Sequence, residues 1–419
     1  RRIKRILPAL FFVCLFSSFL SVFLLNPAQL NEFGNNLIGV ATFLSNMVLL
    51  FTQGYFEQEA ELNPLVHMWT LSVEEQYYIL IPILLMTLYY FKSKKAILPA
   101  VALLTLLSLF ISILLTDISD NSFLSSLSFF SIFSRAWELL SGSLIAIFFI
   151  DKDHLKIKRP FNDISILAGL IMIFSPVLFY NPETSFPGIH SIPVIIGTSI
   201  LIVLLNKNSI FYKAFSSKLV VGLGLISYSL YLWHQPLLSF VRVYYSDLSS
   251  LPYSFSTIII LISVFLSYLS WKFVENPLRR TKLGDKAVIL LGLSSLTCLF
   301  ILGLFLKSIS SGYEREMANQ LATNDFIYFQ NMDEREFVFE RIKLHEEVDA
   351  VIVGSSRLMQ LDLSSIDKSS LNLSVSGAFL HDIFSISVAS IKTLSPKELI
   401  IGIDPWIVNK SADLPSPVF

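Results

Sequence analysis

The sequence predicts a polytopic α-helical membrane domain of about nine spans plus one re-entrant segment, followed by a partial α/β domain. Hydrophobic residues make up 53% of the 419 residues and charged residues only 15%, whereas soluble domains carry roughly 25% charged residues. Apolar residues gather into blocks of span length up to Lys307, and after Ser310 the apolar runs shorten to strand length. We therefore predict a membrane domain at 1–310, a linker at 311–345 and the start of an α/β domain at 346–419.

Ten apolar blocks are candidates for helices that satisfy their own backbone groups in lipid. They cover residues 8–25, 36–51, 77–91, 96–116, 124–150, 162–179, 190–205, 219–243, 254–273 and 287–307. The second block is short and contains Asn36, Gly39 and Asn46. These features predict a re-entrant or interfacial segment there rather than a crossing.

The basic residues support this reading of the second block. They concentrate in five clusters, at 1–5, 92–95, 152–159, 207–218 and 272–286. The positive-inside rule assigns all five clusters to the cytoplasm, which requires that one of the ten blocks does not cross. The remaining crossings place the acidic loop 57–61, the loop around Asp117 and Asp120, and the C-terminal domain on the outer side of a plasma (inner) membrane.

Composition also excludes some classes of function. The net charge of -1 gives no reason to expect nucleic acid as a partner. Cys14 and Cys298 both lie inside apolar blocks and lack metal-ligand spacing, so we expect them to be packing residues and expect no metal site.

Ionisable residues inside membrane segments are costly and therefore indicate function. The stretch 67–78, His-Met-Trp-Thr-Leu-Ser-Val-Glu-Glu-Gln-Tyr-Tyr, brings Glu74 and Glu75 to the start of a span. The two acids either take part in chemistry or only stabilise a helix N-terminus.

Three further clusters carry charge or hydrogen-bonding groups into later spans. Arg135 and Glu138 lie three residues apart, so they form either a functional pair or one that neutralises itself. His234 precedes a proline within the stretch 227–237, where it is either a catalyst or a packing group. Glu275 begins the stretch Glu-Asn-Pro-Leu-Arg-Arg at the cytoplasmic face, which also suits a topological anchor.

Together these clusters resemble the acyltransferase-3 family of membrane acyltransferases, which O-acylate lipopolysaccharide, peptidoglycan and other surface glycans. Residues 1–8 are similar to the family's basic stretch, and 69–78 to its W-S-L-S-V-E-E-Q-F-Y signature, with Thr70 replacing a serine. Residues 135–138, 228–236 and 275–279 match three further family blocks in order. Family members carry one or two spans ahead of the basic stretch, with an arginine and the histidine assigned as catalytic base. We expect those spans to be missing from this sequence, which starts at the basic stretch.

The resemblance implies transfer of an acyl group, expected to be acetyl, from a cytoplasmic acyl coenzyme A to a cell-surface or lipid-linked glycan, with membrane lipid around the protein. No tightly bound cofactor is expected, because acetyl coenzyme A acts as a co-substrate. Arg1, Arg2 and Arg5 would bind its phosphates, unless they serve only as positive-inside anchors.

Roles in the chemical step follow from the same resemblance. Glu74 and Glu75, near the outer mouth, are the preferred polar participants because burial can tune a carboxylate for general-base work. His234 is the second choice, and Arg135 would hold a phosphate or an oxyanion.

The C-terminal region alternates strands and helices, which suggests a parallel α/β layer. A predicted buried strand at 349–354 runs into Gly-Ser-Ser-Arg at 354–357, and its order of elements resembles the start of an SGNH-hydrolase-like domain. That resemblance makes Ser356 the nucleophile candidate and Gly377 the oxyanion-hole glycine, with Asp404 near the position of the family's asparagine. We expect the closing D-x-x-H block to be missing from this sequence, so we predict no complete triad in it.

Two other functions remain open on the sequence. A transporter or flippase for a glycan precursor would also need charges inside the membrane. A noncatalytic membrane protein that binds glycan through its C-terminal domain is the second alternative. Neither predicts a role for coenzyme A.

Overall fold

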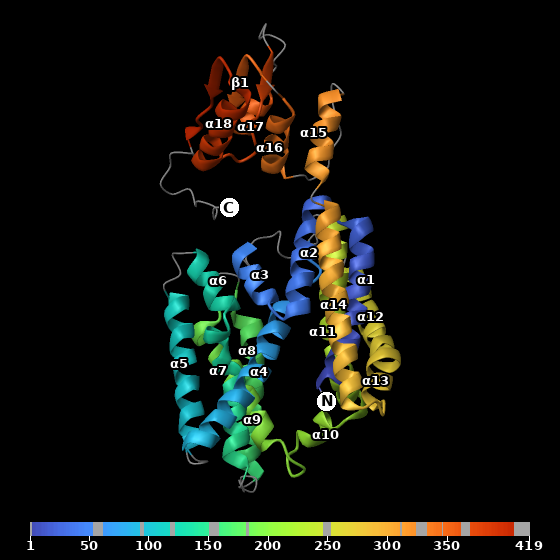
Figure 1. Cartoon of the computed structure of the whole chain (residues 1–419). Coiled ribbons are helices and arrows are strands. Elements are labelled where there is room, and N and C mark those ends of the chain that lie inside the picture. The colour runs from blue at the N-terminus through green and yellow to red at the C-terminus, as the bar shows by residue number, and fades with distance from the viewer. Residues whose placement is uncertain are drawn as a thin grey trace. The chain divides into compact units, whose positions relative to one another are not determined.

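The computed structural model describes residues 2–52, 62–92, 96–117, 122–150, 159–181, 184–245, 253–310, 312–323, 333–345, 347–361 and 369–405. The chain divides into two compact units, one comprising residues 1–24 and 32–305 and the other residues 25–31 and 306–419. Figure 1 shows a first unit built of helices, while all strands of the described residues belong to the second.

Helices dominate the first unit. Its long helices are α1 (Arg2–Leu24), α4 (Met68–Lys92), α5 (Ile97–Asp117), α7 (Ile132–Phe149), α8 (Arg159–Phe179), α11 (Lys218–Tyr244), α12 (Tyr253–Ser270) and α14 (Asp285–Ser310). Shorter ones are α2 (Pro27–Thr42), α3 (Ser45–Thr52), α6 (Ser122–Phe130), α9 (Ile192–Leu204), α10 (Tyr212–Phe215) and α13 (Asn276–Arg280), with a 3₁₀ turn at Gly188–Ser191 and a π-helical turn at Trp271–Glu275.

Seven helical stretches within the described residues are long and apolar enough to cross a membrane. They are Arg2–Leu24, Met68–Tyr90, Ile97–Thr116, Phe123–Phe149, Arg159–Phe179, Phe255–Arg280 and the stretch that begins at Asp285. The polytopic helical membrane domain is thus confirmed, but two expected spans are not among the seven. One of them, α9, has only 13 residues, and the other, α11, has 27 residues but carries Ser, Tyr, His and Gln side chains along its middle.

The segment expected to be re-entrant, 36–51, is divided between α2 and α3. Phe43 separates them and has a φ of 56°, the left-handed conformation that commonly ends a helix. Helix α2 comes close to the start of α3 at Gly39. A glycine is needed there because a Cβ would lie 2.8 Å from the Cα of Ser45. Gln76 of α4 holds the break by donating to the carbonyl of Phe43 at 2.9 Å. With 16 and 8 residues, neither α2 nor α3 has the length of a crossing.

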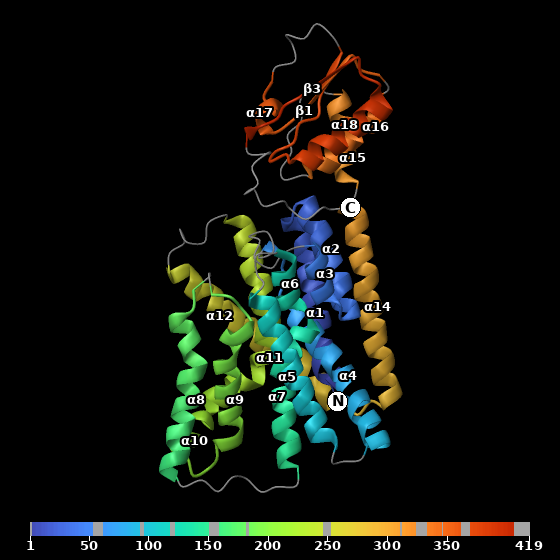
Figure 2. The same ribbon diagram turned by 90° about the vertical axis from the view of Figure 1, so that its left-hand side faces the viewer.

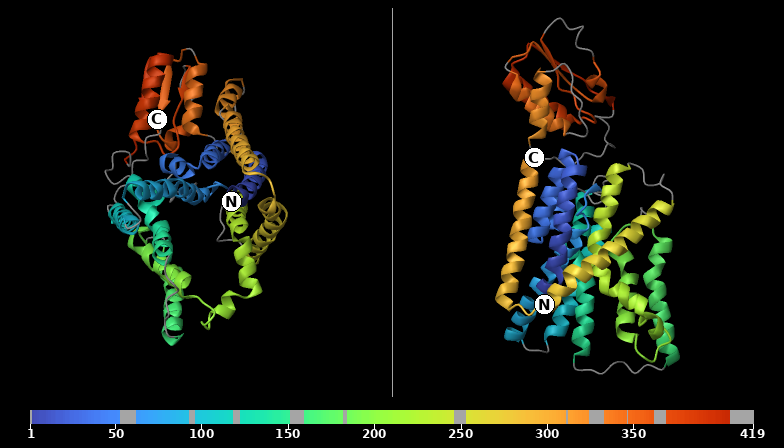
Figure 3. Two further views of the ribbon diagram at one scale, coloured as in Figure 1. Left: turned by 60° about the horizontal axis from the view of Figure 1, so that its bottom comes forward. Right: turned by 90° about the vertical axis from the view of Figure 1, so that its right-hand side faces the viewer.

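The long helices of the first unit pack in neighbouring pairs. Helix α5 lies along α7, α8 along α9, and α11 along α12 (Figure 2). Helix α14 runs beside α1, as the right-hand view of Figure 3 shows. Gly292 marks this approach, since a Cβ on it would lie 2.9 Å from Cδ1 of Leu7.

The second unit contains a small parallel sheet of β1 (Ala350–Val353), β2 (Ser370–Asn372) and β3 (Glu398–Ile401), in the order β2-β1-β3. Val351 pairs with Leu371 on one side and Leu399 on the other. Its helices are α15 (Tyr313–Thr323), α16 (Glu334–Leu344), α17 (Ser356–Met359) and α18 (Leu380–Leu394), and α16 packs against α18. Strand β1 lies within the stretch 349–354, where the sequence predicted a strand, and the sheet is parallel as expected. Three short strands do not by themselves identify an SGNH domain.

Candidate functional site

An ion pair joins the basic stretch at the start of α1 to the acidic signature of α4. Arg2 Nη2 lies 2.7 Å from Glu75 Oε1, and the Arg2 guanidinium stacks on the ring of Tyr78 at 3.2 Å from its centroid. Glu74, the neighbouring acid, is half-buried and lies within electrostatic reach of Arg2. Arg5 is exposed, and Arg1 lies outside the described residues.

This pair links two expectations, that Glu75 lies near the outer mouth and that Arg2 lies at the cytoplasmic face, because the two side chains are in contact. A carboxylate 2.7 Å from Arg2 cannot lie at the outer mouth while Arg2 lies at the cytoplasmic face. The reason is that α4 begins at Met68, so that Glu75 stands two turns inside the helix and reaches the N-terminal turn of α1. Glu74 and Glu75 therefore belong with the basic stretch.

A second polar junction connects α1, α11 and the π-helical turn. Glu275 is 2% exposed and accepts a hydrogen bond of 3.2 Å from Ser229 Oγ of α11. One position earlier on α11, the Tyr228 hydroxyl donates to the carbonyl of Ile6 at 2.9 Å. Glu275 is therefore held deep in the bundle by a specific donor, which a mere surface anchor would not need. π-Helical turns of this kind occur often at functional sites.

Two histidines meet between the start of α4 and the middle of α11. The ring centroids of His67 and His234 are 5.1 Å apart, and the ring of His67 also lies 4.9 Å from that of Tyr231. The Tyr231 hydroxyl is 2.6 Å from Thr70 Oγ1 and also donates to the carbonyl of His67. His234 Nδ1 lies 2.7 Å from the carbonyl of Tyr231.

The ring of His67 is enclosed by protein. Both ring nitrogens are shielded from solvent, near the carbonyls of Tyr231 and Leu232, and neither forms a well-shaped hydrogen bond within the described part of the chain. Buried polar atoms normally have partners, so an enclosed imidazole of this kind is a candidate for a proton carrier or a ligand contact.

Sequence reasoning assigned His67 no role of its own, although one signal was present. His67, Thr70 and Glu74 are spaced by three and four residues, so they share one face of a helix. That face meets Tyr231 of α11, and Glu74 also lies within electrostatic reach of this tyrosine. The residues missed by sequence reasoning thus complete a polar stripe that leads from the histidine pair to the Arg2–Glu75 pair.

Arg135 and Glu138 form the expected pair along α7. Arg135 Nη1 lies 3.0 Å from Glu138 Oε1, and the guanidinium is only 14% exposed. Trp69, Phe129 and Phe186 surround it, with ring centroids 5.3 to 5.6 Å from Cζ. Aromatic rings therefore enclose Arg135 and hold it by cation–π attraction, while Glu138 supplies the opposite charge. The role of phosphate or oxyanion binder stays a prediction for Arg135.

In the second unit, Ser355 rather than Ser356 makes the polar contacts. Ser355 is 1% exposed, caps α17 and hydrogen-bonds to Asp404 Oδ2. Ser356 is exposed on the first turn of α17. Gly377 has a φ of 59°, which favours glycine. Arg357 Nη1 lies 3.6 Å from Asp404 Oδ1. No histidine lies with Ser356 and Asp404 in the described residues. The structure therefore shows no general base for Ser356 there, and its role as a nucleophile stays a prediction.

The fold and these sites define a polytopic membrane protein whose helix bundle encloses ion pairs and a histidine pair. The chain belongs to the acyltransferase-3 family, since the family model described as "Acyltransferase domain" matches residues 1–272.

Curated relatives support this assignment. The chain is 30% identical over 295 residues to the O-acetyltransferase OatA of Staphylococcus aureus, a match covering 68% of this chain and 47% of that protein. It is 33% identical over 216 residues to an uncharacterized protein of Haemophilus influenzae, which covers 50% of this chain and 86% of the relative. A putative O-acetyltransferase of Staphylococcus aureus strain COL is 30% identical over 299 residues, or 69% of this chain and 48% of the relative. The chain thus spans about half the length of its O-acetyltransferase relatives. No solved structure matches it.

Proposed function

We propose that this protein transfers an acetyl group from cytoplasmic acetyl coenzyme A to a hydroxyl of a cell-surface polysaccharide, such as lipopolysaccharide O-antigen or peptidoglycan. The observation that carries the proposal is the His67–His234 pair, enclosed between α4 and α11 and continued by Glu74 toward Arg2 and Glu75. Family membership and the names of the S. aureus relatives support O-acetylation as the reaction class.

The donor would enter at the N-terminal end of α1. Arg1, Arg2 and Arg5 offer charge to the phosphates of coenzyme A, and Arg2 is oriented for this by its bond to Glu75 and its stacking on Tyr78. The side chain of Arg2 is 40% exposed, so it can be reached by a ligand while it keeps its ion pair.

The chemical step would use the histidine pair. His234 takes the proton of the acceptor hydroxyl as its oxygen attacks the thioester carbonyl carbon, forming the new C–O bond. The C–S bond then breaks, and the coenzyme A thiolate recovers the proton from the imidazolium. The backbone carbonyl of Tyr231 orients His234 by contacting its Nδ1. Thr70 in turn positions Tyr231 through the hydrogen bond to its hydroxyl. The ring of His67 lies beside that of His234, with the two centroids 5.1 Å apart.

Placement of the parts follows from the basic clusters. The protein would be a multi-pass protein of the plasma (inner) membrane, with the unit that begins near residue 306 on the periplasmic or extracellular side, where surface glycans are completed. Accessibility labelling of single-cysteine variants at Ser356 and Arg5 tests this, because labelling of both positions from the same side contradicts the layout.

The decisive experiment follows label from acetyl coenzyme A. Membranes from cells that express the natural gene receive radiolabelled acetyl coenzyme A, and label is then measured on the extracted polysaccharide. We expect label with the wild type, at least about 100-fold less with His234→Gln, and wild-type levels with His190→Gln. His190 is a matched control because it packs on Tyr180 and binds the carbonyl of Ser185 instead of joining the pair. Absence of label with the wild type would favour a transporter or a glycan-binding protein.

A further inference from the structure

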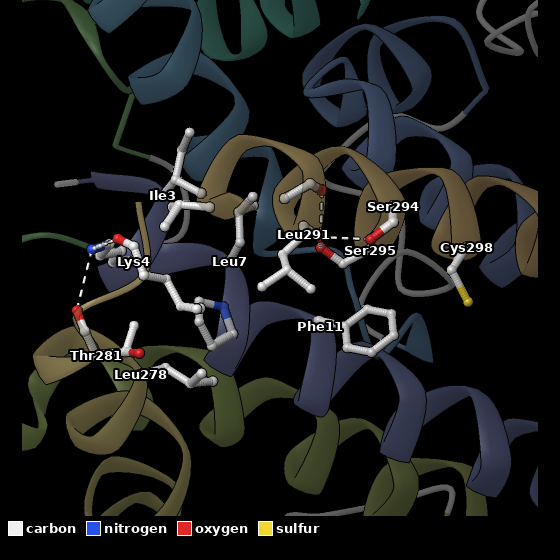
Figure 4. A pocket seen from close by; sticks show the side chains of 14 residues that line it. Ile3, Lys4, Leu7, Phe11, Leu278, Thr281, Leu291, Ser294, Ser295 and Cys298 are labelled. Carbon is white, nitrogen blue, oxygen red and sulfur yellow. Dashed lines mark hydrogen bonds between the residues drawn. The ribbon is translucent and has the colours of Figure 1, made fainter. Parts of the chain in front are cut away.

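An apolar hollow lies between α1 and the segment from α13 into the first half of α14 (Figure 4). Its volume is about 400 Å³, and its wall includes Leu7, Phe11, Leu278, Leu283 and Leu291. Three of these side chains remain open to the surroundings, since Leu278 is 40%, Leu283 41% and Leu291 55% exposed. The hollow is therefore reachable from the outer surface of the helix bundle.

One end of the hollow carries positive charge. Lys4 Nζ donates to the carbonyls of Thr281 at 3.3 Å and Leu283 at 3.1 Å. An ammonium has three N–H donors, so this geometry leaves room for one more acceptor. The segment that forms this wall also bears exposed cations, namely Arg279, Arg280, Lys282 and Lys286.

The rest of the hollow offers only apolar surface. Ser294 and Ser295 line it, but their hydroxyls donate to carbonyls of their own helix, at 3.0 Å and 2.9 Å to Leu291. Cys298 lies at the end opposite Lys4 in Figure 4. From Val288 to Cys298 the wall follows eleven residues of helix, a rise of about 15 Å. That length accommodates a large part of one fatty acyl chain, and the apolar lining does not suit an extended polar ligand.

The width of the hollow is fixed by the approach of α1 to α14. A Cβ on Gly292 would lie 2.9 Å from Cδ1 of Leu7 and 3.1 Å from Cγ2 of Ile3. The two helices therefore touch at this glycine, and the hollow remains beside the contact. Such a gap in a close-packed surface calls for a flexible apolar occupant.

We propose that the hollow binds one acyl chain of an anionic phospholipid, whose phosphate is held at Lys4. An apolar slot that ends in a cationic rim is complementary to a lipid with a negative headgroup, because basic residues at a membrane surface attract anionic lipids. A zwitterionic lipid with the same chains makes the same apolar contacts in the hollow but is attracted less strongly by the cations at its end. This binding is independent of acyl transfer, since none of the residues invoked belongs to the histidine pair or the Arg2–Glu75 pair.

Cys298 provides a direct readout. The chain has two cysteines, and Cys14 is fully buried whereas Cys298 is exposed. The purified full chain in detergent is treated with a maleimide in the presence of phosphatidylglycerol, phosphatidylcholine with identical chains, or inorganic phosphate. We expect phosphatidylglycerol to slow the labelling of Cys298 at least about threefold relative to phosphatidylcholine, and phosphate alone to have no effect. Equal protection by both lipids, or by neither, overturns the proposal.

Two variants locate the effect. Lys4→Gln keeps the shape of the hollow and should reduce protection by phosphatidylglycerol to the phosphatidylcholine level. Ser295→Phe fills the hollow and should abolish retention of phosphatidylglycerol in native mass spectrometry, whereas Leu290→Phe, at a position of α14 that is 68% exposed, should not. If Ser295→Phe fails to fold, Lys4→Gln decides, and unchanged protection in that variant overturns the proposal. His234→Gln should keep wild-type protection, so the lipid site and the proposed enzyme activity fail separately.

Discussion

Both units of this protein have an apolar core, but the first also exposes many large apolar side chains and buries polar ones among its helices. In the first unit, Phe19 and Leu290 are 64% and 68% exposed, while Asn36 and Glu275 are 1% and 2% exposed. In the second unit the buried cluster is aliphatic and includes Val351 at 0%. The exposed apolar side chains of the first unit suit lipid.

The difference teaches where function is to be sought. Polar groups are costly inside a lipid-facing bundle, and those of α1, α4 and α11 converge on one stripe instead of scattering. In the second unit the half-buried ion pair of Arg335 with Asp382 joins α16 to α18 through two hydrogen bonds of 2.9 Å. We therefore expect substitutions of buried polar groups to remove activity in the first unit and stability in the second.

The largest effect is expected at His67. His67→Gln should lower acetyl transfer to polysaccharide by about 100-fold or more, because it replaces the enclosed imidazole beside His234 with an amide. The measurement is the rate of label transfer from acetyl coenzyme A in membranes with equal amounts of folded protein. A variant with the wild-type rate would show that His67 is not part of the functional portion of the polar stripe.

A smaller effect is expected at Glu75. Glu75→Gln removes the partner of Arg2 while keeping the size of the side chain, and should raise KM for acetyl coenzyme A about fivefold, since a partly exposed ion pair contributes about 1 kcal/mol. The value of kcat should change less than KM if Arg2 serves donor binding. A fall in kcat alone would instead place Glu75 in the chemical step.

In the second unit, Asp382→Asn should cost about 1 kcal/mol of local stability, a value discounted because Arg335 is 42% exposed. Hydrogen exchange of the amides of α16 and α18 in the full chain measures it. Acetyl transfer should stay at the wild-type rate when the folded fraction is accounted for. Loss of acetyl transfer without loss of exchange protection in α16 and α18 would contradict the expectation that this pair serves stability and not activity.

The same pair predicts a pH dependence. Burial acts to raise the pKa of Asp382, but the hydrogen bonds from Arg335 and from the Phe379 backbone N–H, together with the charge of Arg335, hold it below the ordinary value of 3.8. Because the folded-state pKa is depressed, the pair contributes its full stability above pH 3.8 and loses it as the pH falls through the folded-state pKa. Exchange protection of α16 and α18 should therefore fall in that acidic range in the wild type and not in Asp382→Asn.

The smallest effect is expected at Ser356. Because it is exposed and lacks a histidine partner among the described residues, Ser356→Ala should change local stability by no more than about 0.5 kcal/mol and leave acetyl transfer unchanged. Ser355→Ala is the matched comparison and should cost about 1 kcal/mol as a lost N-cap. An inactive Ser356→Ala with intact exchange protection would establish a second catalytic centre.

Sequence reasoning and structure agree most closely on local features. The pairing of Arg135 with Glu138 follows from helical spacing, and the position of β1 follows from the short apolar run ahead of Gly354. The position of Glu75 did not follow, because the hydropathy of a span does not reveal that α4 begins at Met68 and approaches the start of α1.

By itself, the sequence determined that most of this protein is a helical membrane domain, that a region with strands follows, and that the motifs of one acyltransferase family are present in order. Those properties depend on composition and on spacing along one chain, which local physics sets. Only the tertiary structure decided that His67 meets His234, that Arg2 pairs with Glu75 and that Lys4 closes one end of an apolar hollow. Each of these contacts joins helices far apart in the sequence, and the packing that brings them together depends on all the side chains at once.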